Sequence, residues 1–179
     1  VLALHPGGSP GPGYGTQFLR TVVGPALRDW GAIIVSPDVP DRRWTNDTSE
    51  RGVMALLDDV MKRYSIDSDR VLITGFSMGG AGTWYLATRH PDLFKAAIPM
   101  AARSDPAAAA DVGNMPVFII HARDDEVVPF GPAEALADEM QARGQTVSFL
   151  PLEGVGHFRM GAAPLKDGGA WVLERWAER

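Results

Sequence analysis

Apolar residues along the chain follow two patterns that succeed one another. Short, uniformly apolar runs bounded by glycine, proline or polar residues are typical of strands buried on both faces. Between them, apolar residues recur at intervals of three and four, which is typical of helices with one buried face. The strand-like runs cover residues 1–4, 32–35, 71–73, 96–98, 117–120 and 147–150, and the helical segments cover 16–30, 53–64, 78–90, 132–143 and 165–176.

This alternation of strand and helix predicts the architecture. Strands that are apolar on both faces need helices on both sides, so we expect an α/β fold with a doubly wound, mostly parallel sheet of about six strands. A chain of 179 residues suits one domain over residues 1–179. In such a sheet the functional loops lie at the carboxyl ends of the strands.

Composition removes several classes of function. The formal charge is −5, and no long run of like charges is present, so we expect no nucleic-acid partner. The absence of cysteine excludes disulfides, a thiolate nucleophile and cysteine-bound zinc. No apolar run is long enough to span a bilayer. Nothing in the pattern indicates a metal or a cofactor, and oligomeric state and localisation stay open.

The stretch Val-Leu-Ile-Thr-Gly-Phe-Ser-Met-Gly-Gly at residues 71–80 carries the strongest chemical signal. A buried strand turns sharply into a helix, and Ser77 lies at the bend. Gly75 and Gly79 remove side chains that would clash there, and the helix N-terminus lies beneath the serine. This context favours a nucleophile elbow over the alternative interpretation, a glycine-rich turn with a capping serine.

A serine nucleophile needs a base, and the chain has four histidines. His157 follows the last strand in a glycine-rich loop, after Ser77 in chain order, so it is the best candidate; the alternative is a loop histidine with no catalytic role. His5 and His121 come at strand ends and could be buried structural residues. His90, before a proline, is more typical of a helix end.

The acid and the oxyanion donors are less sharply defined. Asp124, Asp125 and Glu126 all follow the strand at 117–120, and chain order cannot separate them. We expect one to point inward, because carboxylates held together in a dry site repel each other. Met78, after the nucleophile, should supply one oxyanion amide, and the loop at residues 5–8 the other, although that loop could equally be a simple turn.

Four motifs taken together resemble the α/β-hydrolase superfamily, in particular its phospholipase/carboxylesterase and dienelactone-hydrolase-like esterases. They occur in order over nearly the whole chain: Leu4-His5-Pro6-Gly7-Gly8, Gly75-Phe76-Ser77-Met78-Gly79-Gly80, His121-x-x-x-Asp125-x-x-Val128-Pro129 and Gly156-His157. The resemblance implies a minimal α/β-hydrolase fold. The short link between residues 98 and 117 predicts that it carries no lid domain. Family members usually have two further strands ahead of residue 1, so the domain is expected to lack N-terminal strands.

The resemblance also implies roles for individual residues. Ser77 would be the nucleophile, His157 the base and Asp125 the acid, while the amides of Gly7 and Met78 would form the oxyanion hole. The family usually has glycine where this chain has Pro6. Proline offers no amide, so the second donor is expected to be Gly7 or Gly8.

The expected function is a serine hydrolase that cleaves carboxylic esters with small or exposed acyl groups through an acyl-enzyme, without a cofactor or metal. Arg43 and Trp44, with Arg42, are candidate substrate-binding residues, the arginines favouring a carboxylate; a solvated arginine pair with a packing tryptophan is equally consistent. Three alternatives remain open: a dienelactone or thioester hydrolase, a peptidase of the prolyl-oligopeptidase type, and a non-catalytic relative.

Overall fold

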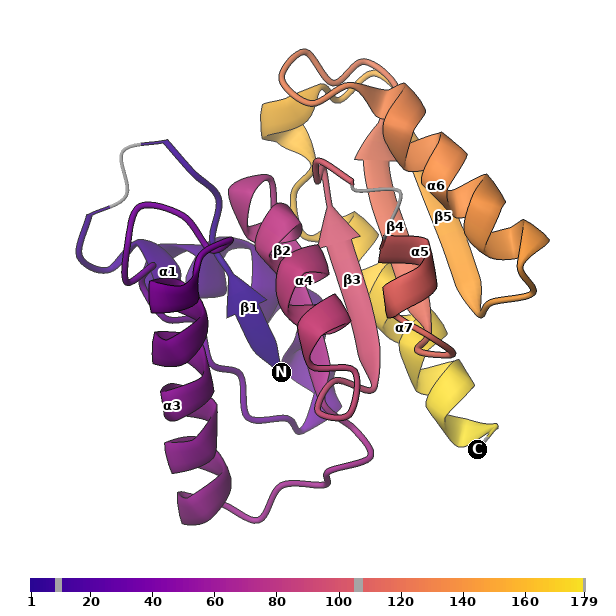
Figure 1. Ribbon diagram of the computed structural model, residues 1–179. Coiled ribbons are helices and arrows are strands. Elements are labelled where there is room, and N and C mark those ends of the chain that lie inside the picture. The colour runs from indigo at the N-terminus through magenta and orange to yellow at the C-terminus, as the bar shows by residue number, and fades with distance from the viewer. Residues whose placement is uncertain (9–10, 105–107, 179) are drawn as a thin grey trace.

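The fold is a parallel β-sheet whose strands follow one another in chain order. The computed structural model describes residues 1–8, 11–104 and 108–178. Its sheet has the order β1-β2-β3-β4-β5, and all neighbouring pairs are parallel (Figure 1). The expected α/β class is therefore confirmed. The strands are β1 (Leu2–Leu4), β2 (Leu72–Phe76), β3 (Ala96–Met100), β4 (Val117–Ala122) and β5 (Val147–Leu152).

The expected buried strand at residues 32–35 is reduced to a single bridge. Val35 pairs in parallel with Leu2 on the outer side of β1, through hydrogen bonds from the Ala3 amide to the Val35 carbonyl (2.8 Å) and from the Val35 amide to the Val1 carbonyl (2.9 Å). Ile33 is 39% exposed. The prediction of a buried strand was wrong because the run lies at the sheet edge, where it pairs on one side only.

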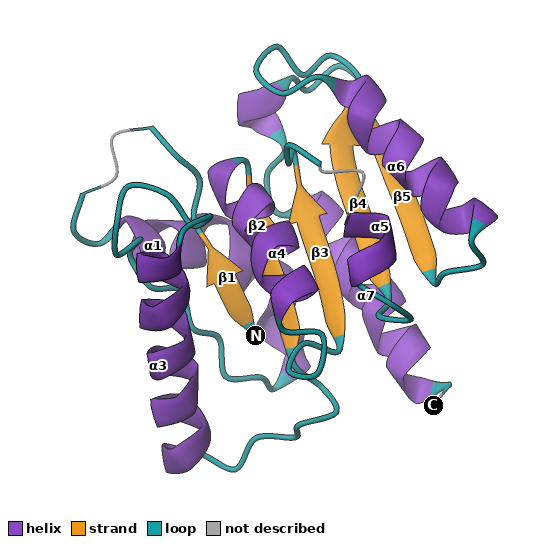
Figure 2. Cartoon of the chain, viewed as in Figure 1, coloured by secondary structure: helices purple, strands orange, loops and turns teal. Residues whose placement is uncertain are grey.

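Helices cover both faces of the sheet (Figure 2). One face carries α3, α4, α5 and α6, and the other carries α1, α2 and α7. Within the described ranges, no helix has the length and apolarity needed to cross a membrane. The bounds are α1 (Tyr14–Phe18), α2 (Gly24–Leu27), α3 (Asp47–Arg63), α4 (Met78–Arg89), α5 (Ala108–Asp111), α6 (Phe130–Ala142) and α7 (Ala163–Ala177).

Two hydrophobic clusters, one on each face, explain why the strands are apolar throughout. In β4, Val117 and Ile119 pack with the cluster under α3 to α6, whereas Phe118 and Ile120 pack with the cluster under α1, α2 and α7. Successive side chains of a strand point to opposite faces, so both faces of the sheet must be apolar. One domain over residues 1–179 stays a prediction.

Two helical segments depart from the regular pattern. The first is helical from residue 14 to 30, with a π-helical turn, Leu19–Val23, directly before Gly24 and Pro25. Proline lacks an amide and crowds the preceding turn, which accounts for the irregularity. The link from β3 to β4 contains the single short helix α5 in its described part, and residues 105–107 lie outside the described residues.

Close packing of α4 predicts the effect of one substitution. A Cβ on Gly82 would overlap Trp44, whereas a Cβ on Gly131 in α6 would meet no atom within 4 Å. We expect Gly82→Ala to destabilise the protein by ~1–3 kcal/mol through overpacking. The control Gly131→Ala should be neutral or stabilise by up to ~1 kcal/mol. Denaturant unfolding measures both, and equal stabilities would contradict the packing described.

Candidate active site

The loops that follow β1, β2, β4 and β5 all lie at one edge of the sheet, because the strands are parallel. They carry the four motifs of the sequence. Ser77 follows β2 directly, Asp125 follows β4, and His157 follows β5. Segments that are far apart in the chain therefore meet at the carboxyl ends of the strands.

The sharp turn that the sequence predicted at Ser77 has a strained backbone. Ser77 has φ 55° and ψ −113°, a conformation that residues with a side chain rarely adopt. Its amide donates to the Met100 carbonyl at 2.8 Å. A Cβ on Gly75 would overlap the Gly79 carbonyl, and one on Gly79 would overlap the Leu4 carbonyl. The two glycines thus let α4 begin directly against β1 and β2.

The structure brings Ser77, His157 and Asp125 into one chain of hydrogen bonds. Ser77 Oγ lies 2.8 Å from His157 Nε2, and His157 Nδ1 lies 2.8 Å from Asp125 Oδ2. The side chains of His157 and Asp125 are 3% and 0% exposed. When Nδ1–H donates to the carboxylate, Nε2 is left to accept the serine proton. This arrangement can deprotonate the serine hydroxyl.

Asp125 is held by its own turn. Its Oδ1 accepts hydrogen bonds from the amides of Val127 (2.9 Å) and Val128 (2.7 Å). Burial acts to raise the pKa of Asp125, but the Val128 amide, His157 and the Val127 amide outweigh it and lower the pKa. His121 supports the same turn, because its Nε2 lies 3.0 Å from the Val128 carbonyl and 3.4 Å from Asp125 Oδ2.

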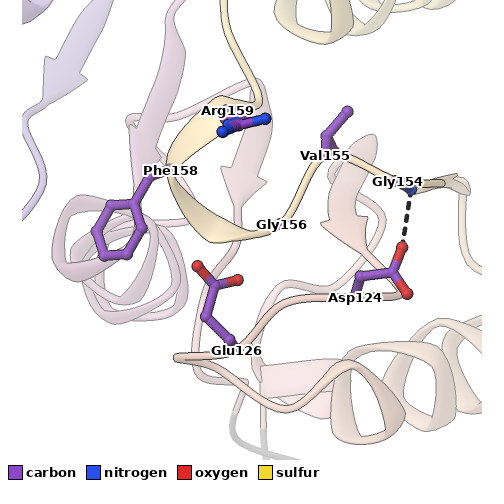
Figure 3. A pocket seen from close by; sticks show the side chains of 7 residues that line it. All are labelled: Asp124, Glu126, Gly154, Val155, Gly156, Phe158 and Arg159. Atoms are coloured by element: carbon purple, nitrogen blue, oxygen red, sulfur yellow. Dashed lines mark hydrogen bonds between the residues drawn. The ribbon is translucent and has the colours of Figure 1, made fainter.

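The two neighbouring carboxylates bind the backbone of the histidine loop. Asp124 Oδ2 accepts the Gly154 amide at 2.8 Å (Figure 3). Glu126 Oε2 accepts the His157 amide at 2.9 Å. The His157 amide lowers the pKa of Glu126. Both carboxylates border an open pocket of about 560 Å³. In the described part of the chain, no three His, Asp or Glu side chains form a group that could hold a metal ion.

The loop after β1 lies against the start of α4. A Cβ on Gly7 would lie 3.4 Å from the Met78 Cβ, and the Tyr14 hydroxyl donates to the Gly7 carbonyl at 3.3 Å. The two residues expected to supply oxyanion amides are therefore neighbours. Their role as donors stays a prediction.

His5 and Trp44 form the buried support of this loop. His5 Nδ1 lies 2.7 Å from the Pro6 carbonyl, and its Nε2 accepts the Val39 amide at 3.0 Å. Burial lowers the pKa of His5. Trp44 is fully buried, and its indole N–H donates to the His5 carbonyl at 2.9 Å. Arg43 is exposed. The structure thus places Trp44 beneath the loop. Among the described contacts, none joins Arg43 or Trp44 to Ser77 or His157.

Two phenylalanines flank the His157 ring, and sequence reasoning did not single them out. The ring centroids of Phe76 and Phe158 each lie 5.1 Å from that of His157. Phe158 is 76% exposed, whereas His157 is 2% exposed. The only available signal was their position beside Ser77 and His157 in the motifs. Both rings therefore lie next to the buried imidazole.

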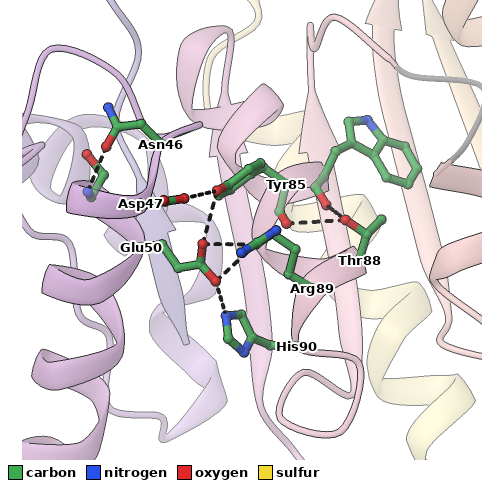
Figure 4. A network of polar contacts seen from close by, with 9 residues as sticks. Asn46, Asp47, Glu50, Tyr85, Thr88, Arg89 and His90 are labelled. Carbon is green, nitrogen blue, oxygen red and sulfur yellow. Dashed lines mark hydrogen bonds and ion pairs between the residues drawn. The ribbon is translucent and has the colours of Figure 1, made fainter.

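His90 belongs to a separate network at the far end of α4 (Figure 4). Its Nε2 lies 2.8 Å from Glu50 Oε1, and the same carboxylate accepts hydrogen bonds from Arg89 Nε (2.9 Å) and the Tyr85 hydroxyl (3.0 Å). Burial acts to raise the pKa of Glu50, but Arg89, His90 and Tyr85 outweigh it and lower the pKa. The network ties α3 to α4.

Residues 36–162, well over half of the chain, match the family model described as "Dienelactone hydrolase family". The chain belongs to the dienelactone hydrolase family. The matched segment contains Ser77, Asp125 and His157, whereas the loop at residues 5–8 lies outside it. The α/β-hydrolase resemblance of the motifs is thereby confirmed.

Among curated proteins, this family member is similar to Cutinase 2 of Thermobifida cellulosilytica, at 31% identity over 154 residues that cover 82% of this chain and 58% of that cutinase. Cutinase cut1 of Thermobifida fusca is also 31% identical, and the alignment covers 82% of this chain and 48% of that cutinase. The chain thus spans about half the length of the curated relatives it matches.

Two solved structures share the fold. A thermostable esterase aligns with a TM-score of 0.80 and 25% identity, covering 97% of this chain and 53% of that chain. Esterase PE8 aligns with a TM-score of 0.78 and 22% identity, covering 97% of this chain and 90% of that esterase. The second likeness concerns the fold alone. Together they place this dienelactone hydrolase family member among proteins with the α/β-hydrolase fold.

The network around Glu50 predicts a pH-dependent stability. Because the folded-state pKa of Glu50 is lowered, its contribution is present above the unfolded pKa of about 4.3 and is lost as pH falls through the folded pKa. We expect Glu50→Gln to lower the unfolding free energy by ~1–3 kcal/mol at pH 7. The difference from wild type should shrink when the same denaturant unfolding is repeated below pH 4.

A matched control separates this effect from the loss of any carboxylate. Among the described residues, Glu139 forms an ion pair with Arg143 alone, and the two side chains are 40% and 46% exposed. Glu139→Gln should change stability by no more than ~0.5 kcal/mol. An equal loss in both variants, or a Glu50→Gln difference that persists at low pH, would count against the network as described.

Proposed function

We propose that this chain is a serine hydrolase that cleaves carboxylic esters through an acyl-enzyme. The single observation that carries the proposal is the hydrogen-bonded series from Ser77 Oγ to His157 Nε2 and from His157 Nδ1 to Asp125, with both distances 2.8 Å. Membership of the dienelactone hydrolase family and similarity to cutinases support it.

The proposed reaction has two steps. Ser77 Oγ attacks the ester carbonyl while His157 Nε2 takes its proton, and Asp125 stabilises the imidazolium that forms. The amides of Gly7 and Met78 would receive the charge that develops on the carbonyl oxygen. His157 then gives the proton to the leaving alcohol. In the second step, His157 activates a water molecule, which attacks the acyl carbon and releases the acid from Ser77.

A lactone is the second candidate substrate, because the matching family is that of dienelactone hydrolases; a thioester is the remaining class that the same nucleophile could attack. Both classes need the same nucleophile and base and differ only in what the pocket accepts. A panel of one ester, one lactone and one thioester of equal acyl length would rank the three classes by kcat/KM. The highest value identifies the preferred class.

One test of the proposed function concerns the nucleophile. Ser77→Ala removes the attacking oxygen, so we expect turnover of p-nitrophenyl acetate to fall by about a million-fold, to the residual level of the site without its nucleophile. A fluorophosphonate should label wild type and leave the variant unlabelled. Circular dichroism would verify that the variant is folded. Hydrolysis at the wild-type rate in a folded Ser77→Ala protein would overturn the proposal.

Another test concerns Glu126 as a positioning residue. Its carboxylate holds the His157 amide, so Glu126→Ala should let the loop shift and lower kcat by roughly 10- to 100-fold, with KM little changed. Glu126→Gln keeps an acceptor oxygen and should recover most of kcat. Steady-state kinetics on p-nitrophenyl acetate measures both.

The control for Glu126 is a carboxylate in the histidine loop itself. Glu153 is 73% exposed and pairs with Arg123 at 2.8 Å, so Glu153→Ala should leave kcat near the wild-type value. If Glu126→Ala retained full activity, or if glutamine failed to recover it, the hydrogen bond to the His157 amide would not be what positions the imidazole.

A further inference from the structure

A small pocket lies beside the candidate nucleophile, on the side of the sheet covered by α1. It has a volume of about 190 Å³ and is predominantly apolar. Two polar residues of the helical segment, Gln17 and Thr21, complete its lining. The apolar lining residues are Pro6, Tyr14, Phe18, Val22 and Phe76.

Two of the lining residues connect this pocket to the reaction centre. Phe76 directly precedes Ser77, and its ring centroid lies 5.1 Å from that of His157. Pro6 directly precedes Gly7, the expected oxyanion donor. The pocket is therefore lined by the residues that directly precede the nucleophile and the expected oxyanion donor.

The walls of the pocket are firmly built. Phe18 is 5% exposed, and Tyr14 is fixed by its hydrogen bond to the Gly7 carbonyl and by an edge-on contact with His5 at 5.0 Å. Thr21 donates its hydroxyl to the Gln17 carbonyl at 2.9 Å, so this polar group is already satisfied within the helix. A preformed apolar wall of this kind binds an apolar group without first having to be ordered.

We propose that this pocket is the subsite for the apolar arm of the ester, an uncharged aliphatic or aryl group. The inference rests on the proposed function. None of the described residues that line the pocket is charged, so a charged arm would lose its hydration without gaining a partner. A water-sized group occupies about 30 Å³, so the pocket volume of about 190 Å³ holds about six such groups. This is the size of a butyl to hexyl chain or a phenyl ring.

Two ester series test the subsite and identify the arm that it binds. One lengthens the acyl chain of p-nitrophenyl esters from acetate to hexanoate, and the other lengthens the alcohol of acetate esters from ethyl to hexyl. We expect kcat/KM of the wild type to rise by about fourfold per methylene in one series until the pocket is full. The series that rises identifies the acyl or the alcohol arm.

A matched pair of variants assigns that dependence to the pocket. Thr21→Trp fills the pocket and should flatten the rise with chain length. Arg20→Trp adds the same ring to the neighbouring exposed residue of the π-helical turn, which does not line the pocket, and should keep the rise. Gln17→Trp, at another exposed position of the pocket lining, serves where Thr21→Trp does not fold, as judged by circular dichroism.

The outcomes separate failure of the subsite from failure of the proposed function. The subsite is overturned, and the proposed hydrolase stands, if the wild type hydrolyses p-nitrophenyl acetate but neither series depends on chain length. The same conclusion follows if Arg20→Trp flattens the rise as much as Thr21→Trp. If the wild type neither hydrolyses any ester nor reacts with a fluorophosphonate, both are overturned. A rise that only the pocket-filling variants abolish supports the subsite.

Discussion

The backbone of Ser77 is the constraint on which the candidate site depends. A residue with a side chain rarely adopts φ 55°, and such strain persists only where the surroundings enforce it. Here the enforcement comes from both directions: the Met100 carbonyl holds the Ser77 amide, and side-chain-free Gly75 and Gly79 let α4 begin against the backbone of β1. The serine hydroxyl is consequently placed at the sheet edge by the core of the fold and does not depend on a mobile loop.

The partners of Ser77 are placed by a different part of the sheet. β4 and β5 pair along their whole length, from Val117 with Val147 to Ala122 with Leu152, so the acid loop and the histidine loop leave the sheet side by side. Three consecutive carboxylates then bind the histidine loop at three points: Asp124 at the Gly154 amide, Glu126 at the His157 amide, and Asp125 at the His157 imidazole. The glycine-rich loop that carries His157 thereby holds one orientation of the imidazole.

Several of these features could be predicted from the sequence, and the exceptions have physical reasons. The elbow was predictable because strand, glycine and helix patterns meet at Ser77. Apolar periodicity could not distinguish an edge run from a central strand, which is why residues 32–35 were misjudged. It also placed the start of α3 too late, because the first turn is polar and is stabilised by the Asn46 cap on the Ser49 amide. Asp125 was separated from its neighbours only by family resemblance, since the decisive hydrogen bonds depend on the turn geometry at Val127 and Val128.

The same turn decides where the proton resides during the proposed reaction. A carboxylate that accepts two amides is stabilised in its charged form, and the pKa of Asp125 is lowered despite its burial. Asp125 is then a weaker base than an isolated buried carboxylate would be, so a proton taken from Ser77 stays on the imidazole, from which it can be given to the leaving alcohol. The side chains of His157 and Asp125 are both buried, which strengthens the attraction between the imidazolium and the carboxylate. The hydrogen bonds at Val127 and Val128 thus keep Asp125 as an electrostatic partner and leave His157 as the base.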